Sequence, residues 1–157
     1  QGPLVLVGSS MGGWVMLLAS LARRERVHGL IGLAAAPDFT EELVWKSYSP
    51  DEQEKLMREG KIEEPSPYGD KPYVFTRELI EDGRRHLLLG ASIALDAPVR
   101  LIHGLGDRDV PYQTSLKLAE KLATRDVVVT LIKGADHRLS RDEDIALIHA
   151  TVAAVSA

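Results

Sequence analysis

The sequence predicts an α/β fold in which a mostly parallel sheet is flanked by helices, and three observations support this prediction. Short apolar runs rich in β-branched residues recur along the chain, as is typical of strands buried in a parallel sheet. Amphipathic helical segments alternate with these runs, which is the pattern of βαβ units with right-handed crossovers. One charged stretch rich in proline and glycine interrupts the alternation, and it predicts an inserted subdomain.

The first βαβ unit lies at the N-terminal end. Residues 4–7 are apolar and predict a strand buried on both faces. Residues 11–24 predict a helix, because apolar side chains recur there at helical spacing and two arginines close it, where a helix C-terminus favours cations. Residues 27–35 predict the second buried strand.

Residues 40–92 predict a small helical subdomain inserted into a sheet domain made of residues 1–39 and 93–157. Ser49 is a suitable N-cap, and Pro50 suits the first position of the helix that follows it. The helices predicted in the subdomain are residues 41–48, 50–59 and 75–87.

Regular alternation then resumes. Both predicted strands are apolar and β-branched, and both predicted helices are amphipathic. The strands are residues 99–103 and 127–132, and the helices are residues 113–123 and 142–155.

The composition excludes several classes of function. The 157 residues carry a net charge of -4 and are 45% hydrophobic, so we expect a globular domain without the basic surface that nucleic acids need. The absence of cysteine excludes disulfides, thiolate metal sites and cysteine nucleophiles. No apolar run is long enough to span a membrane. The sequence therefore predicts neither a nucleic-acid partner nor a membrane span.

The first chemical motif is Gly8-Ser9-Ser10-Met11-Gly12, which matches G-x-S-x-G between a predicted strand and a predicted helix. This is the setting of a nucleophile elbow, in which the serine occupies a sharp, strained turn. Small residues are then needed two positions away on both sides, and Gly8 and Gly12 meet that need. The backbone N–H of Met11 is expected to donate to a developing oxyanion. On the pentapeptide alone, a glycine-rich turn without chemistry is the alternative.

The second motif follows the strand at residues 99–103 and supplies an acid. Asp107 lies where acids at the carboxyl edge of a sheet can point into a crevice and orient a histidine. Asp109 is the competing acid, and its alternative role is to cap the helix that starts near Pro111. His103 and Asp107 resemble a metal-ligand pair in spacing, but a glycine-broken loop is not a helix face, so we predict no metal site.

The third motif contains His137, in the loop between the last strand and the last helix. It comes third in the order Ser10, Asp107, His137, and a histidine in this loop can reach over the sheet edge to a serine at an earlier strand end. His103 is too close to the Asp107 loop to be the better base, and we expect it to pack or hydrogen-bond there.

Together these motifs resemble those of the α/β-hydrolase superfamily. The elbow GSSMGG, the segment HGLGDRDVP and the later DH occur in the order of that superfamily, each after a strand. The chain is particularly similar to the branch of mitochondrial palmitoyl-protein thioesterases and acyl-glucuronide esterases and their bacterial homologues. The similar stretches are GSSMGGWVML, LIGLAAAPDF, PVRLIHGLGDRDVP and DHR.

This resemblance implies a serine hydrolase that cleaves small carboxylic esters or acyl thioesters without a cofactor. Ser10 would attack the carbonyl, His137 would carry its proton to the leaving group, Asp107 would fix the histidine tautomer, and water would release the acyl group. The implied location is the cytoplasm in a bacterium and the mitochondrion in a eukaryote. Two alternatives stay open: another chemistry on the same triad, such as carbon–carbon bond hydrolysis or peroxidase activity, and a catalytically silent binding module.

The resemblance also implies that residues 40–92 form a short helical cap. Its aromatic residues are candidates for a wall that contacts an acyl chain, or alternatively for anchors that hold the cap helices. They are Trp45, Tyr48, Tyr73 and Phe75.

In the α/β-hydrolase fold, several strands and a second oxyanion donor precede the elbow strand, whereas here that strand starts at residue 4. The chain therefore corresponds to about the C-terminal two thirds of the fold. We expect it to associate with a missing N-terminal part of a larger polypeptide or to dimerise, because an open apolar edge favours aggregation. Without the second donor we expect little hydrolysis, since one donor contributes roughly 10²–10³ in rate.

Overall fold

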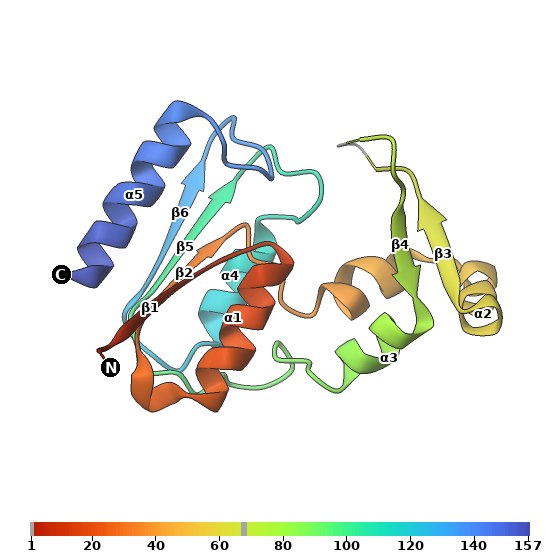
Figure 1. The fold of residues 1–157 in the computed structure, drawn as a ribbon, viewed down its shortest axis with the longest axis horizontal. Coiled ribbons are helices and arrows are strands. Elements are labelled where there is room, and N and C mark those ends of the chain that lie inside the picture. Colours follow the sequence, from red (N-terminus) through yellow and green to blue (C-terminus); the bar gives the residue numbers. More distant parts are fainter. Residues whose placement is uncertain (1, 67–68) are drawn as a thin grey trace. The chain divides into compact units, whose positions relative to one another are not determined.

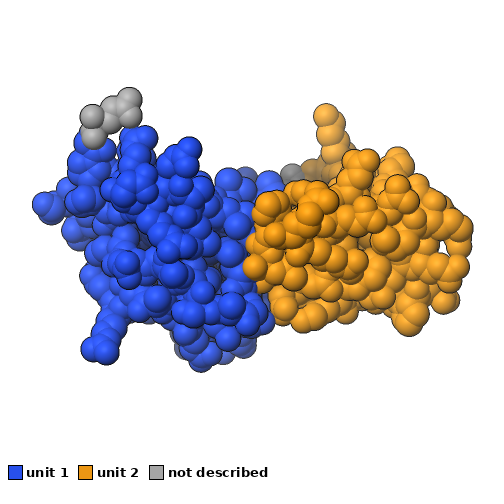
Figure 2. All heavy atoms as spheres, turned by 90° about the horizontal axis from the view of Figure 1, so that it is seen from below, with its two compact units in different colours: residues 1–37, 88–157 blue, residues 38–87 orange. Residues whose placement is uncertain are grey.

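The computed structural model describes residues 2–66 and 69–157. It comprises two compact units, which Figure 2 colours separately. The sheet unit contains residues 1–37 and 88–157, and the inserted unit contains residues 38–87. None of the helices in the described ranges is both long enough and apolar enough to cross a membrane.

The sheet unit is built on a four-stranded parallel sheet of order β1-β2-β5-β6, which confirms the predicted fold class (Figure 1). Its strands are β1 (Leu4–Ser9), β2 (Val27–Leu33), β5 (Val99–Gly104) and β6 (Val127–Ile132). Its helices are α1 (Met11–Ala22), the short 3-10 helix η1 (Arg24–Arg26), α4 (Gln113–Lys121) and α5 (Asp142–Ser156). Because all four strands run the same way, the loops after them meet at one edge of the sheet.

Helices cover both faces of this sheet. The larger apolar cluster joins α1 and α4 to one face, with Leu17, Leu30 and Leu118 fully buried in it. A smaller cluster on the other face joins Ile102 of β5 to apolar residues of α5. Figure 1 shows α5 on the side of the sheet opposite α1 and α4. The alternating helices and strands thus bury both faces of β2 and β5.

The strand β1 differs from its prediction. Leu4 and Val7 are 38% and 48% exposed, so the expectation of burial on both faces was wrong. The reason is position: within the described residues β1 is the last strand of the sheet and pairs with β2 alone. Pairing of its free edge with further chain or with a second copy stays a prediction.

The inserted unit contains a short hairpin that the sequence analysis did not predict. Its elements are η2 (Thr40–Trp45, a π-helix), α2 (Pro50–Glu59), β3 (Lys61–Glu64), β4 (Tyr73–Thr76) and α3 (Arg77–Arg84). β3 and β4 are antiparallel, with Ile62 opposite Phe75. The predicted helix at residues 75–87 was therefore wrong at its start, because the aromatic and β-branched residues of β4 pair with β3. Thr76 then caps α3, its hydroxyl accepting from the Leu79 N–H.

The predicted start of α2 is confirmed. The Ser49 hydroxyl accepts a hydrogen bond from the Glu52 backbone N–H, Pro50 occupies the first turn, and the Glu52 carboxylate accepts from the Ser49 N–H in return. This reciprocal pair satisfies two N–H groups that the helix itself leaves unpaired.

Candidate active site

Ser10 lies in a strained turn between β1 and α1. Its φ of 53° and ψ of -124° fall in a region that residues other than glycine rarely adopt. The end of β2 holds the turn in place: the Ser10 N–H donates to the Leu33 carbonyl at 2.9 Å, and the Ala36 N–H donates to the Ser10 carbonyl at 3.0 Å. The Ser10 side chain is therefore positioned by backbone bonds to the last residue of β2 and to the loop that follows it.

Two glycines permit this turn: Gly8, which the motif predicts, and Gly13, which takes the place of the expected Gly12. A Cβ on Gly8 would lie 2.5 Å from the Gly12 carbonyl oxygen, so Gly8 is required. A Cβ on Gly12 would meet nothing within 4 Å, whereas one on Gly13 would lie 2.5 Å from the Ala35 Cβ. The expectation for Gly12 was wrong within the described chain, because the close approach to the loop after β2 falls one residue later, at Gly13.

His137 and Asp107 come from the loops after β6 and β5, whose ends are in register at Gly104 and Ile132. The two loops touch. A Cβ on Gly104 would lie 2.3 Å from the Ala135 carbonyl oxygen, and the Gly106 N–H donates to the same oxygen at 2.9 Å. This close backbone contact holds the two loops together.

The three candidate side chains form one continuous hydrogen-bonded relay. His137 Nε2 lies 3.0 Å from Ser10 Oγ, and His137 Nδ1 lies 2.8 Å from Asp107 Oδ2. The Asp107 side chain is completely buried, and that of His137 is 16% exposed. Since a carboxylate only accepts hydrogen bonds, Nδ1 carries the ring proton and Nε2 accepts from the serine hydroxyl. A histidine in this state can take a proton from Ser10.

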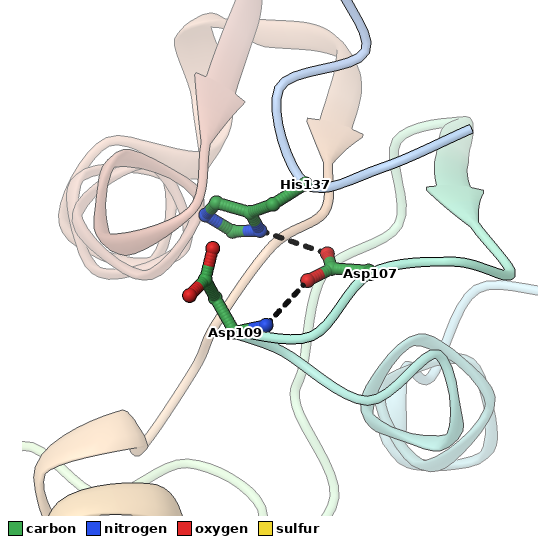
Figure 3. Close-up of side chains that lie close together, drawn as sticks. All are labelled: Asp107, Asp109 and His137. Carbon is green, nitrogen blue, oxygen red and sulfur yellow. Dashed lines mark hydrogen bonds and ion pairs between the residues drawn. The ribbon is translucent and has the colours of Figure 1, made fainter. Parts of the chain in front are cut away.

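Figure 3 shows how the two candidate acids differ. Asp107 faces the His137 ring with one oxygen, while its other oxygen accepts from the backbone N–H groups of Asp109 and Val110 at 2.9 Å each. The structure thus brings Asp107, not Asp109, into contact with Nδ1. One potential metal-ligand atom from each of Asp107, Asp109 and His137 lies within 4.8 Å of the other two. Both ring nitrogens of His137 are already hydrogen-bonded, however, to Asp107 and to Ser10. The geometry is that of a proton relay.

The electrostatics of the relay favour an ionised acid and a basic histidine. Burial alone would raise the pKa of Asp107, but hydrogen bonds from His103, His137 and two backbone N–H groups hold this pKa far below its ordinary value. The hydrogen bond to Asp107 raises the pKa of His137; burial opposes this effect, and the negative charges of Asp107, Asp109 and Asp136 add to it.

Met11, the expected oxyanion donor, is the first residue of α1. Its N–H belongs to the N-terminal set of a helix that has no intrahelical acceptor, and it follows Ser10 directly. This places a backbone donor at the positive end of the helix dipole beside the serine.

The four aromatic residues predicted to contact substrate all lie in the inserted unit. Tyr48 is buried in its apolar cluster, and its hydroxyl lies 2.5 Å from a Glu64 carboxylate oxygen. Phe75 and Trp45 pack partly buried against the same cluster. The Arg84 guanidinium lies 4.3 Å from the centre of a Trp45 ring. Tyr73 is 42% exposed. Three of the four therefore help to hold the inserted unit together, whatever else they contact.

His103 forms the contacts expected of it beside the Asp107 loop, and Ser115 is a further residue behind the site that was not predicted. His103 is fully buried and bonds on one side to the Ser115 hydroxyl at 2.7 Å, while its Nε2 lies 3.1 Å from Asp107 Oδ2. The short separation of His103 and Asp107 in sequence indicated a hydrogen bond in this loop, but nothing in the sequence indicated Ser115 of α4.

Comparison with known proteins places the chain in a family. Residues 2–154 match the prolyl oligopeptidase family. The chain is 39% identical over 155 residues to the mouse mitochondrial palmitoyl-protein thioesterase ABHD10 and 40% identical over 155 residues to the human protein. These matches cover 97% of this chain and 51% and 50% of the two relatives, so the chain spans about half their length.

Two solved structures are also similar to the chain in fold and in sequence. A crystal structure from Agrobacterium vitis S4 matches with a TM-score of 0.90 and 42% identity, over 96% of this chain and 60% of that one. Mouse alpha/beta hydrolase domain-containing protein 10 matches with a TM-score of 0.89 and 37% identity, over 99% of this chain and 62% of that one. The chain therefore belongs to the prolyl oligopeptidase family and has the α/β-hydrolase fold.

Proposed function

We propose that the chain carries the catalytic residues of a serine hydrolase that cleaves carboxylic esters or acyl thioesters through an acyl-serine intermediate. The observation that supports this most directly is the unbroken relay from Ser10 through His137 to the buried Asp107. It lies at the edge of a parallel sheet where the strands end, which is where α/β proteins bind ligands.

In the first half of the reaction, Ser10 Oγ attacks the carbonyl carbon while His137 Nε2 takes the hydroxyl proton. The resulting imidazolium is stabilised by the ionised Asp107 at Nδ1. The proton then passes from Nε2 to the leaving alcohol or thiol as its bond to the acyl carbon breaks. In the second half, His137 Nε2 takes a proton from water while the water oxygen attacks the acyl carbon. The same nitrogen then returns the proton to Ser10 Oγ as the bond from Oγ to the acyl carbon breaks and the carboxylic acid leaves.

The negative oxygen that forms during each attack needs donors. We assign the Met11 N–H as one of them, because it is the first N–H of α1 and lies next to the nucleophile. The helix dipole adds a partial positive charge at the same place.

For the substrate, we propose an acyl ester or thioester with an apolar acyl chain. The sequence relatives named palmitoyl-protein thioesterase support this choice. We assign Tyr73 as the first candidate for an acyl contact because it is exposed, and we keep Trp45, Tyr48 and Phe75 as contacts to be tested. In a eukaryotic source we place the protein in the mitochondrion, as in the names of these relatives, and in a bacterium in the cytoplasm.

The nucleophile is tested with a fluorophosphonate probe and intact-mass measurement. We expect one adduct, which Ser10→Ala removes and the matched neighbour variant Ser9→Ala retains. Folded protein that takes up no adduct, or Ser10→Ala protein that is still labelled, would reject the proposal.

The substrate class is tested with p-nitrophenyl esters and acyl thioesters of two to sixteen carbons. A rate that rises with chain length and falls on Tyr73→Ala supports an apolar acyl substrate. A flat, negligible profile in a protein that the probe labels would instead favour the alternatives, namely carbon–carbon bond hydrolysis on the same residues or a binding module.

A further inference from the structure

A second histidine, His103, contacts Asp107, the acid of the relay. Asp107 Oδ2, the oxygen that binds His137 Nδ1 at 2.8 Å, also lies 3.1 Å from His103 Nε2. His103 comes from the end of β5 and is completely buried, as is the Asp107 side chain. One carboxylate oxygen therefore lies between two imidazole rings.

The neighbours of His103 show which of its ring nitrogens is the donor toward Asp107. Its Nε2 faces two acceptors, Asp107 Oδ2 and the Val110 carbonyl oxygen at 2.9 Å. Nε2 must therefore carry a proton, which the two oxygens share. On the other side of the ring, Nδ1 is hydrogen-bonded to the Ser115 hydroxyl at 2.7 Å. Ser115 lies in α4 and is 1% exposed, so no substrate can reach this inner pair.

We propose that His103, held by Ser115, is a positioning residue that fixes the Asp107 carboxylate and moderates its pull on the His137 proton. This inference rests on the proposed function, since it names a second layer of the same relay. The five side chains form one line of polar contacts, from Ser10 and His137 through Asp107 to His103 and Ser115.

The physical reason is competition for one oxygen. The His103 N–H offsets part of the negative charge on Oδ2, and it is one of the hydrogen bonds that lower the pKa of Asp107. Without it, Oδ2 would bind the His137 N–H more strongly and the pKa of His137 would rise further. The Val110 carbonyl would also lose a donor, and the loop that carries Asp107 would be freer to move.

The experiment compares His103→Leu with His103→Gln. Leucine removes the donor, whereas the glutamine amide can replace it at the Nε2 position. For His103→Leu we expect the labelling rate constant of Ser10 to fall about ten- to a hundredfold, the range for a hydrogen bond to a charged group. We expect the NMR titration of the His137 ring to move to higher pH. For His103→Gln we expect both values to stay near those of the unchanged protein. The other charges that act on His137, those of Asp109 and Asp136, are the same in every variant.

Two results would overturn the inference. One is a folded His103→Leu protein with unchanged rate and unchanged titration. The other is an equal loss of rate in both variants with no movement of the titration, since that is the mark of disturbed packing alone. If His103→Leu does not fold, Ser115→Ala decides, because it frees the His103 ring with little change in volume. An upward move of the His137 titration supports the inference, and an unchanged titration overturns it.

The failure of this inference is distinguishable from failure of the proposed function. An unchanged protein that takes up no fluorophosphonate rejects the proposed function, while the titration of His137 still reports on His103. Normal labelling of both the unchanged protein and His103→Leu, with identical titrations, rejects only the role of His103.

Discussion

Replacing Asp107 by asparagine should nearly abolish hydrolysis, because the amide cannot satisfy the partners that the carboxylate has. One carboxylate oxygen accepts from the backbone N–H groups of Asp109 and Val110, and the other faces His137 Nδ1 and His103 Nε2. The amide oxygen can keep the backbone pair, and the NH₂ group then points at the two ring nitrogens. Nδ1 of His137 must then accept a hydrogen bond from this NH₂ group, so Nδ1 cannot carry the ring proton. The ring proton then lies on Nε2, where it blocks proton transfer from Ser10.

The expected loss is about 10⁴-fold in kcat, the size seen when the same change gives the wrong tautomer in a serine protease triad. It corresponds to about 5 kcal/mol in the activation barrier. The attraction that the Asp107 carboxylate loses to the His137 imidazolium is similar in size to this barrier change. Two unit charges about 4 Å apart attract by about 4 kcal/mol at an effective dielectric constant of about 20. The Asp107 side chain is buried, so water does not replace this attraction.

The assay is steady-state hydrolysis of a p-nitrophenyl ester, with folding checked by circular dichroism and a cooperative thermal transition. The matched control is Asp109→Asn, two residues away, whose carboxylate acts on His137 through its charge. We expect this variant to stay within about fivefold of the unchanged protein, since an exposed charge contributes little. A large loss for Asp109→Asn together with an active Asp107→Asn would show that the acid has been wrongly identified.

Three further changes have definite expected results. The raised pKa of His137 predicts that kcat/KM falls on the acid side of the profile with a midpoint above about 6.5, because only the neutral ring accepts the Ser10 proton. Gly104→Ala should lower kcat/KM about a hundredfold, the cost of a misplacement near 1 Å, because its Cβ would lie 2.3 Å from the Ala135 oxygen and separate the two site loops. Gly83→Ala should destabilise the inserted unit by about 1–3 kcal/mol in urea unfolding, since its Cβ would lie 2.2 Å from Thr40 Oγ1.

Each of these has its own check. A pH midpoint at or below the ordinary histidine value would contradict the hydrogen bond from His137 to Asp107. Gly90→Ala, where a Cβ meets nothing within 4 Å, controls for the general effect of replacing a glycine. For Gly83, alanine normally stabilises a helix interior, so a stabilised variant would show that the contact with Thr40 is not tight. Adding Thr40→Ala should restore part of the loss, because it removes a buried hydroxyl that has no hydrogen-bond partner among the described residues.

In the inserted unit, the sequence predicted local features and missed pairings. Ser49, Pro50 and the turn after them were predictable, because an N-cap depends on residues within one helical turn. The hairpin of β3 and β4 was not, since Lys61–Glu64 is short and charged and becomes a strand only by pairing with Tyr73–Thr76. The same holds for β1, whose apolar sequence predicted burial that its place in the sheet does not provide.

By itself, the sequence determined the alternation of strands and helices and the positions of Ser10, Asp107 and His137 after three strands. Both depend on short-range patterns: the period of apolar residues, and the glycine that a sharp turn requires. Only the tertiary structure decided which acid faces the histidine and that a second histidine lies behind the acid. Those outcomes depend on the distances between loops that the sheet brings together, such as the 2.8 Å from His137 to Asp107 across thirty residues of chain. The spacing of residues along the sequence does not predict these distances between loops. The distances depend on the order of the strands in the sheet and on backbone contacts such as that of Gly104 with Ala135.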